Sequence, residues 1–235
     1  MNDELNLLIN RYIANHNVMY EGDLKKEFEE LTEFFNSGVQ TYDRPDGFCK
    51  FENNVLIIEH FEFDSANANK KGSTNRQEIF RTSRIKPTGK EFELVYDEIK
   101  CDFTMENYIK NLKNNFLNHY NKIDDYIKNL QKINIINERT NIKVLFCIED
   151  STILGNLNIA TQKPIFAIYC DEFIQLLKDC TKLNYILCCS NFGMSDYAWF
   201  ASISKISEYE QKQIKVSDTK IANLTPQTVT SFIKV

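Results

Sequence analysis

The chain has 235 residues, a length that suits one well-buried core and is short for two large domains. With 43% hydrophobic and 26% charged residues, the composition is that of a folded globular protein and excludes a disordered chain. The net charge of −5 argues against a protein that coats nucleic acid through overall basicity. The N-terminus shows no secretory pattern and no apolar stretch reaches the ~18 residues of a membrane span, so we expect a cytoplasmic protein without membrane contact.

Two helices are predicted at the start of the chain, a short one within 1–20 and a stronger one after it. The second helix carries apolar residues at spacings of four, three and four: Leu24, Phe28, Leu31 and Phe35. We expect Asp23 to cap this helix and Gly38 to end it. A turn, Pro45-Asp46-Gly47, then leads into two strands, 48–51 and 55–64.

Segment 65–90 is the most basic part of the chain, and we expect a loop there with a helical turn around 77–81. It holds seven basic residues and one acidic residue, so it carries +6 and leaves −11 for the remainder of a chain with a total of −5. A basic segment on an acidic protein suits contact with a phosphate backbone or with an acidic partner surface. A strand at 91–96 follows.

The clearest predicted element is a long helix over 104–132. Its apolar stripe recurs at spacings of three and four: Tyr108, Leu112, Phe116, Tyr120, Ile123, Ile127 and Leu130. The elements predicted after it are strands at 143–148 and 164–169, a helix at 171–181, and strands at 185–190 and 198–203.

These elements predict an α/β fold in which one mixed β-sheet is flanked by helices. We expect a single domain over 1–235, with an N-terminal helix (1–20), a core (21–150) and an α/β extension of the same sheet (151–235). The seven cysteines include no CxxC pair and lie mostly within apolar runs, so buried reduced thiols are expected and not a zinc site.

Acidic residues gather around the strands 48–51 and 55–64. Because alternate strand residues share a face, the second strand has one face made of Leu56, Ile58, His60, Glu62 and Asp64. Its other face is made of Val55, Ile57, Glu59, Phe61 and Phe63. The first face changes from apolar to ionisable at His60, as in a strand that leaves the core and enters a polar cleft.

Carboxylates that converge are costly unless a positive charge neutralises them. The candidate metal ligands are Asp46, Glu59, Glu62 and Asp64, and a hard cation such as Mg²⁺ or Mn²⁺ suits such oxygen ligands. That metal would orient a water, lower its pKa and stabilise the charge that develops on a phosphate. The basic segment that follows would hold the polyanion.

Pro45-Asp46, followed by an apolar run that leads into Glu59-His60-Phe61-Glu62, resembles the motif of the PD-(D/E)xK nuclease superfamily, the restriction-endonuclease-like fold. The core order of that fold, helix, three strands, long helix, strand, is similar to the order predicted from Asp23 to Glu149. The resemblance covers about the first two-thirds of the chain. It implies that Asp46 is a metal ligand and that either Glu59 or Glu62 is the second.

The sequence departs from that motif at its lysine. Two residues after Glu59 the chain has Phe61, and two residues after Glu62 it has Asp64. Some members of the superfamily are similar in carrying an acid there, and others take the lysine from elsewhere, which makes Lys70 or Lys71 a candidate. The predicted catalytic residues are Asp46, Glu59, His60, Glu62 and Lys71, with His60 or Asp64 assisting a water. The predicted nucleic-acid contacts are Lys70, Lys71, Arg76, Arg81 and Arg84.

Each of these residues also has a structural interpretation. Asp46 suits a plain β-turn, His60 a core histidine, and Glu62 and Asp64 an exposed sheet face. A second acidic pair, Glu149-Asp150, ends a predicted strand, where a helix cap is the alternative to a site.

The sequence thus predicts a Mg²⁺- or Mn²⁺-dependent nuclease that hydrolyses phosphodiester bonds in DNA, with RNA as an alternative partner. One rival is a non-catalytic nuclease-fold binding module, of the kind used in phage defence or counter-defence, which the missing lysine favours. The other is an acidic protein that binds a protein partner. A homodimer is compatible with all three hypotheses.

Overall fold

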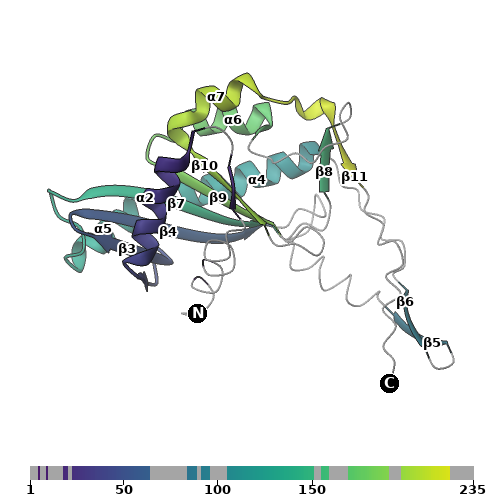
Figure 1. Cartoon of the computed structure of the whole chain (residues 1–235), viewed down its shortest axis with the longest axis horizontal. Coiled ribbons are helices and arrows are strands. Elements are labelled where there is room, and N and C mark those ends of the chain that lie inside the picture. Colours follow the sequence, from purple (N-terminus) through teal and green to yellow (C-terminus); the bar gives the residue numbers. More distant parts are fainter. Residues whose placement is uncertain are drawn as a thin grey trace.

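The computed structural model describes residues 5, 9, 18–20, 23–63, 84–88, 91–95, 105–150, 155–158, 169–190 and 197–222. Its centre is a seven-stranded mixed β-sheet with the strand order β1-β10-β9-β7-β4-β3-β2. Helix α2 lies on one face of this sheet and helices α4, α5 and α6 lie on the other (Figure 1). None of the helices in the described ranges combines the length and hydrophobicity needed to span a membrane.

Groups of strands separated by helices follow one another along the chain. The strands of the main sheet are β1 (Val18–Met19), β2 (Val39–Thr41), β3 (Gly47–Phe51), β4 (Asn54–Phe63), β7 (Asn141–Asp150), β9 (Tyr185–Ser190) and β10 (Tyr197–Ser202). Two smaller sheets pair β5 (Arg84–Thr88) with β6 (Glu91–Val95) and β8 (Gly155–Asn158) with β11 (Thr219–Ala222). The helices are α2 (Lys25–Asn36), α4 (Met105–Tyr120), α5 (Ile123–Lys132), α6 (Asp171–Lys178) and α7 (Ile206–Gln211), with short 3₁₀ turns η3 (Ile203–Lys205) and η4 (Val216–Asp218).

Strand β4 is an interior strand of the sheet, as its apolar first half predicts. It pairs antiparallel with β3 and parallel with β7, and β7 pairs parallel with β9. Val55 to Ile58 are fully buried because both faces of the strand are covered. The predicted α/β class with a mixed sheet is therefore confirmed.

The helical layer over β4 is two helices, so the prediction of one long helix over 104–132 is wrong. The chain turns at Asn121 and Lys122, which are exposed, and asparagine has a low helix propensity. The predicted apolar stripe still packs on the strand, since Tyr108, Phe116 and Leu130 belong to the same buried cluster as Val55 and Ile57.

Two other expectations fail for identifiable reasons. Leu24, and not Asp23, is the N-cap of α2; it makes no side-chain cap hydrogen bond, and its burial fixes the start of the helix. The structure also contains a strand that the sequence did not predict. This strand, β2, forms an antiparallel meander with β3 and β4, and its three residues are too few to show an alternating pattern. The predicted strand 91–96 appears as β6 and pairs with β5, a strand that lies inside the segment expected to be a loop.

Other predicted elements agree with the structure where it describes them. Helix α2 ends at Asn36, and Gly38 has φ 96, a left-handed conformation that favours glycine. Helix α6 and strands β7, β9 and β10 lie where the sequence predicts them. The described cysteines are free thiols, and all but the half-buried Cys188 are buried. The predicted turn at 77–81 and most of the predicted strand 164–169 lie outside the described residues.

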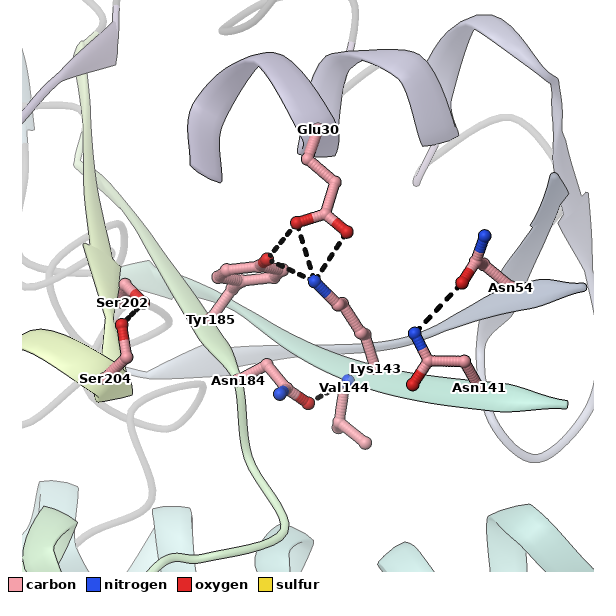
Figure 2. Close-up of polar contacts among 9 residues, drawn as sticks. All are labelled: Glu30, Asn54, Asn141, Lys143, Val144, Asn184, Tyr185, Ser202 and Ser204. Carbon is pink, nitrogen blue, oxygen red and sulfur yellow. Dashed lines mark hydrogen bonds and ion pairs between the residues drawn. The ribbon is translucent and has the colours of Figure 1, made fainter. Parts of the chain in front are cut away.

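A polar triangle joins α2 to the sheet (Figure 2). Lys143 of β7 donates to both carboxylate oxygens of Glu30 in α2, at 2.5 and 2.6 Å. The hydroxyl of Tyr185, the first residue of β9, donates to Glu30 at 2.8 Å and accepts from Lys143 at 3.1 Å. Burial and the nearby carboxylate raise the pKa of the Tyr185 phenol, so it remains a neutral donor.

We expect Glu30→Gln to lower the free energy of unfolding by about 1–2 kcal/mol, because Lys143 is only 21% exposed and would lose its charged partner. Urea denaturation measures the change. The matched control is Glu29→Gln in the same helix. Glu29 is 63% exposed and lies 3.7 Å from Lys25, and its replacement should have no measurable effect. Equal effects of the two substitutions would contradict the role of the triangle.

Candidate functional site

Asp46 and Glu59 lie side by side at the point where β3 begins beside β4. Gly47, the first residue of β3, pairs with Ile58, which places Asp46 next to Glu59. Oδ2 of Asp46 accepts a hydrogen bond of 2.8 Å from the backbone N–H of His60. A side chain at Gly47 would meet Leu5, whose Cδ2 would lie 2.7 Å from the added Cβ. The Asp-Gly pair therefore suits both the hydrogen bond and the close packing at this corner.

Glu59 is a buried acid in the apolar layer between β4 and the helices α4 and α5. It is 6% exposed, and only one other polar or charged residue, Ser202, is buried among the described residues. Oε1 of Glu59 accepts a hydrogen bond of 2.5 Å from the hydroxyl of Tyr126 in α5. The same oxygen lies 2.6 Å from Nδ1 of His119 in α4, and because a carboxylate only accepts, Nδ1 is the donor.

The imidazole of His119 is held on its face as well as at its edge. The ring stacks on Phe61 of β4 with a centroid distance of 4.2 Å and an interplanar angle of 10°. Phe61 follows Glu59 by two residues on the same face of the strand and also packs edge-on against Phe146. The strand thus supplies both partners of the histidine.

Burial and the charge of Glu59 perturb the carboxyl group of Asp46. Burial raises the pKa of Asp46, and the charge of Glu59 raises it further, while the hydrogen bond from His60 and the nearby histidine rings lower it to a smaller extent. Burial and the bond to Glu59 raise the pKa of Tyr126, which keeps the phenol protonated. The site therefore concentrates negative charge that protein donors offset only in part.

The two adjacent carboxylates are oxygen donors of the kind that a hard divalent cation takes together with water. Hydrogen bonds from described residues engage Oδ2 of Asp46 and Oε1 of Glu59, which leaves the second oxygen of each carboxylate available. In the described ranges, no group of three or more His, Cys, Asp or Glu side chains is placed to hold a metal ion. Mg²⁺ is commonly bound through one or two carboxylates with waters and phosphates completing its shell.

The side chains of Glu62 and His60 lie on the face of β4 opposite Glu59. Glu62 is exposed on the opposite face of β4, since it follows Glu59 by three residues. On that same face Nε2 of His60 lies 3.4 Å from Oε2 of Glu149 in β7. The remaining predicted residues, Asp64, Lys70, Lys71, Arg76 and Arg81, lie outside the described residues. Arg84 opens β5.

The second acidic pair has partners on both faces of the sheet. Asp150 accepts a hydrogen bond of 2.6 Å from the hydroxyl of Tyr108 in α4, and Glu149 faces His60. Burial, and the proximity of Asp150, raise the pKa of Tyr108. These contacts tie the end of β7 to its neighbours.

Sequence reasoning missed His119 and Tyr126. The predicted stripe continues from Phe116 in steps of four and three, through Tyr120 and Ile127. A continuation in steps of three and four passes through His119, Ile123, Tyr126 and Leu130, which is the face that packs on β4. The available signal was a polar pair, seven residues apart in the predicted helix, together with one acid on the apolar face of the strand 55–64.

No protein-family model matches the chain, and neither does a curated protein or a solved structure. The case for a function therefore rests on the chemistry of this site. Its components are two adjacent carboxylates, a histidine and tyrosine that bind one of them, and a basic segment that follows β4 in the sequence.

Because the pKa of Asp46 is raised in the folded state, ionisation of this carboxyl group lowers the free energy of unfolding. Between its ordinary value of 3.8 and the higher folded value, the folded state binds more protons than the unfolded state, so stability falls as pH rises through that window. At pH 7 the whole cost is present. In EDTA we expect Asp46→Asn, which still accepts from His60, to be more stable than the wild type at pH 7.

Urea denaturation at several pH values measures this difference, which should shrink as the pH falls towards 4. Asp43→Asn removes an exposed charge from the same turn and controls for the change in net charge. A variant at Asp46 that is less stable than the wild type at every pH would contradict the prediction.

Proposed function

We propose that this protein is a metal-dependent, nuclease-like hydrolase that cleaves phosphodiester bonds in DNA, with Asp46 and Glu59 as its acidic pair. The observation that carries the proposal is the placement of Asp46, at the start of β3, beside Glu59 in β4. These are two of the positions at which the sequence resembles the PD-(D/E)xK motif, and their mutual proximity favours Glu59 over Glu62 as the second acid.

The arrangement of the core elements supports a restriction-endonuclease-like fold. Helix α2 precedes the antiparallel meander β2-β3-β4, and helices α4 and α5 lead to β7, which pairs parallel with β4. Within the main sheet this gives the proposed order of helix, three strands, helices and strand. The first of these strands is β2, whereas the predicted strand 91–96 is β6, which follows β4 in the chain and pairs with β5. Strands β9 and β10 extend the same sheet beyond it.

Each residue of the cluster has a task under this proposal. Asp46 and Glu59 would hold Mg²⁺ or Mn²⁺, which when bound supplies an activated water and stabilises charge on the phosphate. The N–H of His60 fixes the Asp46 carboxylate, and Tyr126 and His119 fix that of Glu59. The basic segment 65–90 would contact the DNA backbone, with Lys70 or Lys71 at the scissile phosphate.

Replacement of Glu59 should separate the two candidate acids. We expect Glu59→Gln to lower kcat of Mg²⁺- or Mn²⁺-dependent DNA cleavage by about 100-fold or more, the scale seen when a group that stabilises transition-state charge is removed. Glu62→Gln should cleave at the wild-type rate, because Glu62 lies on the opposite face of β4. Loss of cleavage in the Glu62 variant with retention in the Glu59 variant would exclude the proposed pair.

The basic segment should supply binding that depends on salt but not on sequence. If three or four of its side chains reach phosphates, log affinity should fall with log salt at a slope of roughly −3, since each neutralised phosphate contributes ~0.9. Joint replacement of Lys70, Lys71, Arg81 and Arg84 by alanine should flatten that slope. A salt titration of DNA binding compares the two proteins, and coincident curves would remove the segment from the interface.

A non-catalytic binding module is the second candidate, and the stacking of Phe61 on His119 favours it. An aromatic residue stands where the resemblance places lysine, and its ring is buried against the histidine. Under this alternative the wild type binds DNA but cleaves none of it with either metal, and Glu59→Gln leaves the affinity unchanged.

A further inference from the structure

We propose that Arg44 and Lys132 contact the phosphate backbone of DNA beside the acidic pair. The inference rests on the proposed function and deepens it, because it assigns DNA contacts within the folded core, in addition to those of segment 65–90. It applies equally to the second candidate, a module that binds DNA without cleaving it. The contacts of one side chain, Asn129 of α5, carry the argument.

Asn129 brings the two basic residues to one place. Its Nδ2 donates a hydrogen bond of 3.1 Å to the carbonyl oxygen of Arg44, in the turn that leads into β3. Its Oδ1 accepts a hydrogen bond of 3.2 Å from Nζ of Lys132, the last residue of α5. The ammonium group of Lys132 and the backbone of Arg44 therefore contact the same amide group, although they come from distant parts of the chain.

The same contacts place the two cations next to the acidic pair. Tyr126, which donates to Glu59, precedes Asn129 by three residues, so the two side chains are neighbours on α5. Arg44 is two residues before Asp46 in the turn. Burial and Glu59 raise the pKa of the Tyr126 phenol, and the charge of Arg44 lowers it, which requires the guanidinium to lie near the phenol. Arg44 is thus a cation at the edge of the acidic site.

Both charges are accessible to a ligand. Arg44 and Lys132 are exposed, and within the described part of the chain neither forms an ion pair with a carboxylate. Lys132 uses one N–H for Asn129 and keeps further donors. The acids of α5 are instead held by lysines at 2.6 and 3.4 Å: Asp124 by Lys182 and Asp125 by Lys128.

The chemistry of this surface suits a phosphate backbone. The guanidinium of Arg44 is a planar set of donors that matches phosphate oxygens and does not lose its charge, and Lys132 adds a second point charge. Exposed charges contribute little to stability, so the fold gains mainly from the bond of Asn129 to the turn. The opposing charge is Asp43, which is exposed in the same turn.

Binding of duplex DNA in EDTA tests the inference in the absence of hydrolysis. We expect joint replacement of Arg44 and Lys132 by glutamine to lower affinity about tenfold at about 0.1 M salt. The slope of log affinity against log salt should shrink by roughly 1.8, since each neutralised phosphate contributes ~0.9. Asp43→Asn should raise affinity about twofold, the scale of a screened interaction between exposed charges.

The matched control removes two positive charges from the other face of the sheet. Lys25 and Lys26 are exposed on α2, and their joint replacement by glutamine should leave the salt slope of the wild type unchanged (Figure 1). Both double variants should unfold at the urea concentration of the wild type, since only exposed side chains are changed. An equal loss of affinity in the α2 control would assign the effect to net charge and overturn the inference.

The remaining outcomes distinguish this inference from the function on which it rests. Coincident salt curves for the wild type and the Arg44/Lys132 variant overturn the inference, and cleavage by the same wild type with Mg²⁺ or Mn²⁺ leaves the proposed function standing. A reduced slope in a protein that cleaves no DNA supports the contacts and rejects hydrolysis. A wild type that binds no DNA at low salt overturns both.

Discussion

The site depends on the hydrogen bonds that His119 and Tyr126 donate to the buried carboxylate of Glu59. A charged group within an apolar layer costs several kcal/mol unless hydrogen bonds compensate it. The compensation comes from Tyr126 and His119, which lie on two helices and reach one oxygen of the acid from above β4. The carboxylate therefore fixes how α4 and α5 sit on the strand. The turn at Asn121 and Lys122 lies between the two donors.

The charge of Glu59 also acts on the neighbouring acid, Asp46. Asp46 directly precedes β3, one of its carboxylate oxygens accepts a hydrogen bond from the backbone of β4, and the charge of Glu59 opposes its ionisation. A fold selected only for stability would gain by replacing Asp46 with an amide side chain, because burial and the charge of Glu59 oppose its ionisation. An acid kept at such a cost beside a second acid is typical of a functional site, because function and stability often compete.

Most of the core was predictable from sequence because apolar periodicity reports burial. The run Val55 to Ile58 predicts an interior strand, and the stripe from Tyr108 to Leu130 predicts the helical layer over it. The pattern could not show the turn at Asn121, since both continuations from Phe116 preserve an apolar face. It also could not show β2, whose three residues are too few to alternate.

The site was predictable to a smaller extent. Asp46 is signalled as an acid in a turn, and Glu59 as the one acid on its face of an apolar strand. The partners of Glu59 lie 60 and 67 residues further along the chain. Long-range hydrogen bonds cannot be assigned from a local pattern, so the pairing of His119 and Tyr126 with Glu59 was seen only in three dimensions. The alternation of strand faces, by contrast, already separates Glu59 from Glu62, and the exposure of Glu62 agrees with it.

We propose that Asp46 and Glu59 bind one cation as a pair, and the thermal midpoint of unfolding with and without Mn²⁺ tests this proposal most directly. An ion that binds only the folded state stabilises it by about 2.7 kcal/mol at 100 times its Kd. The account predicts that Mn²⁺ raises the midpoint of the wild type and leaves that of Asp46→Asn unchanged, although the variant melts higher in EDTA. An equal rise in both proteins, or no rise in the wild type, would contradict it.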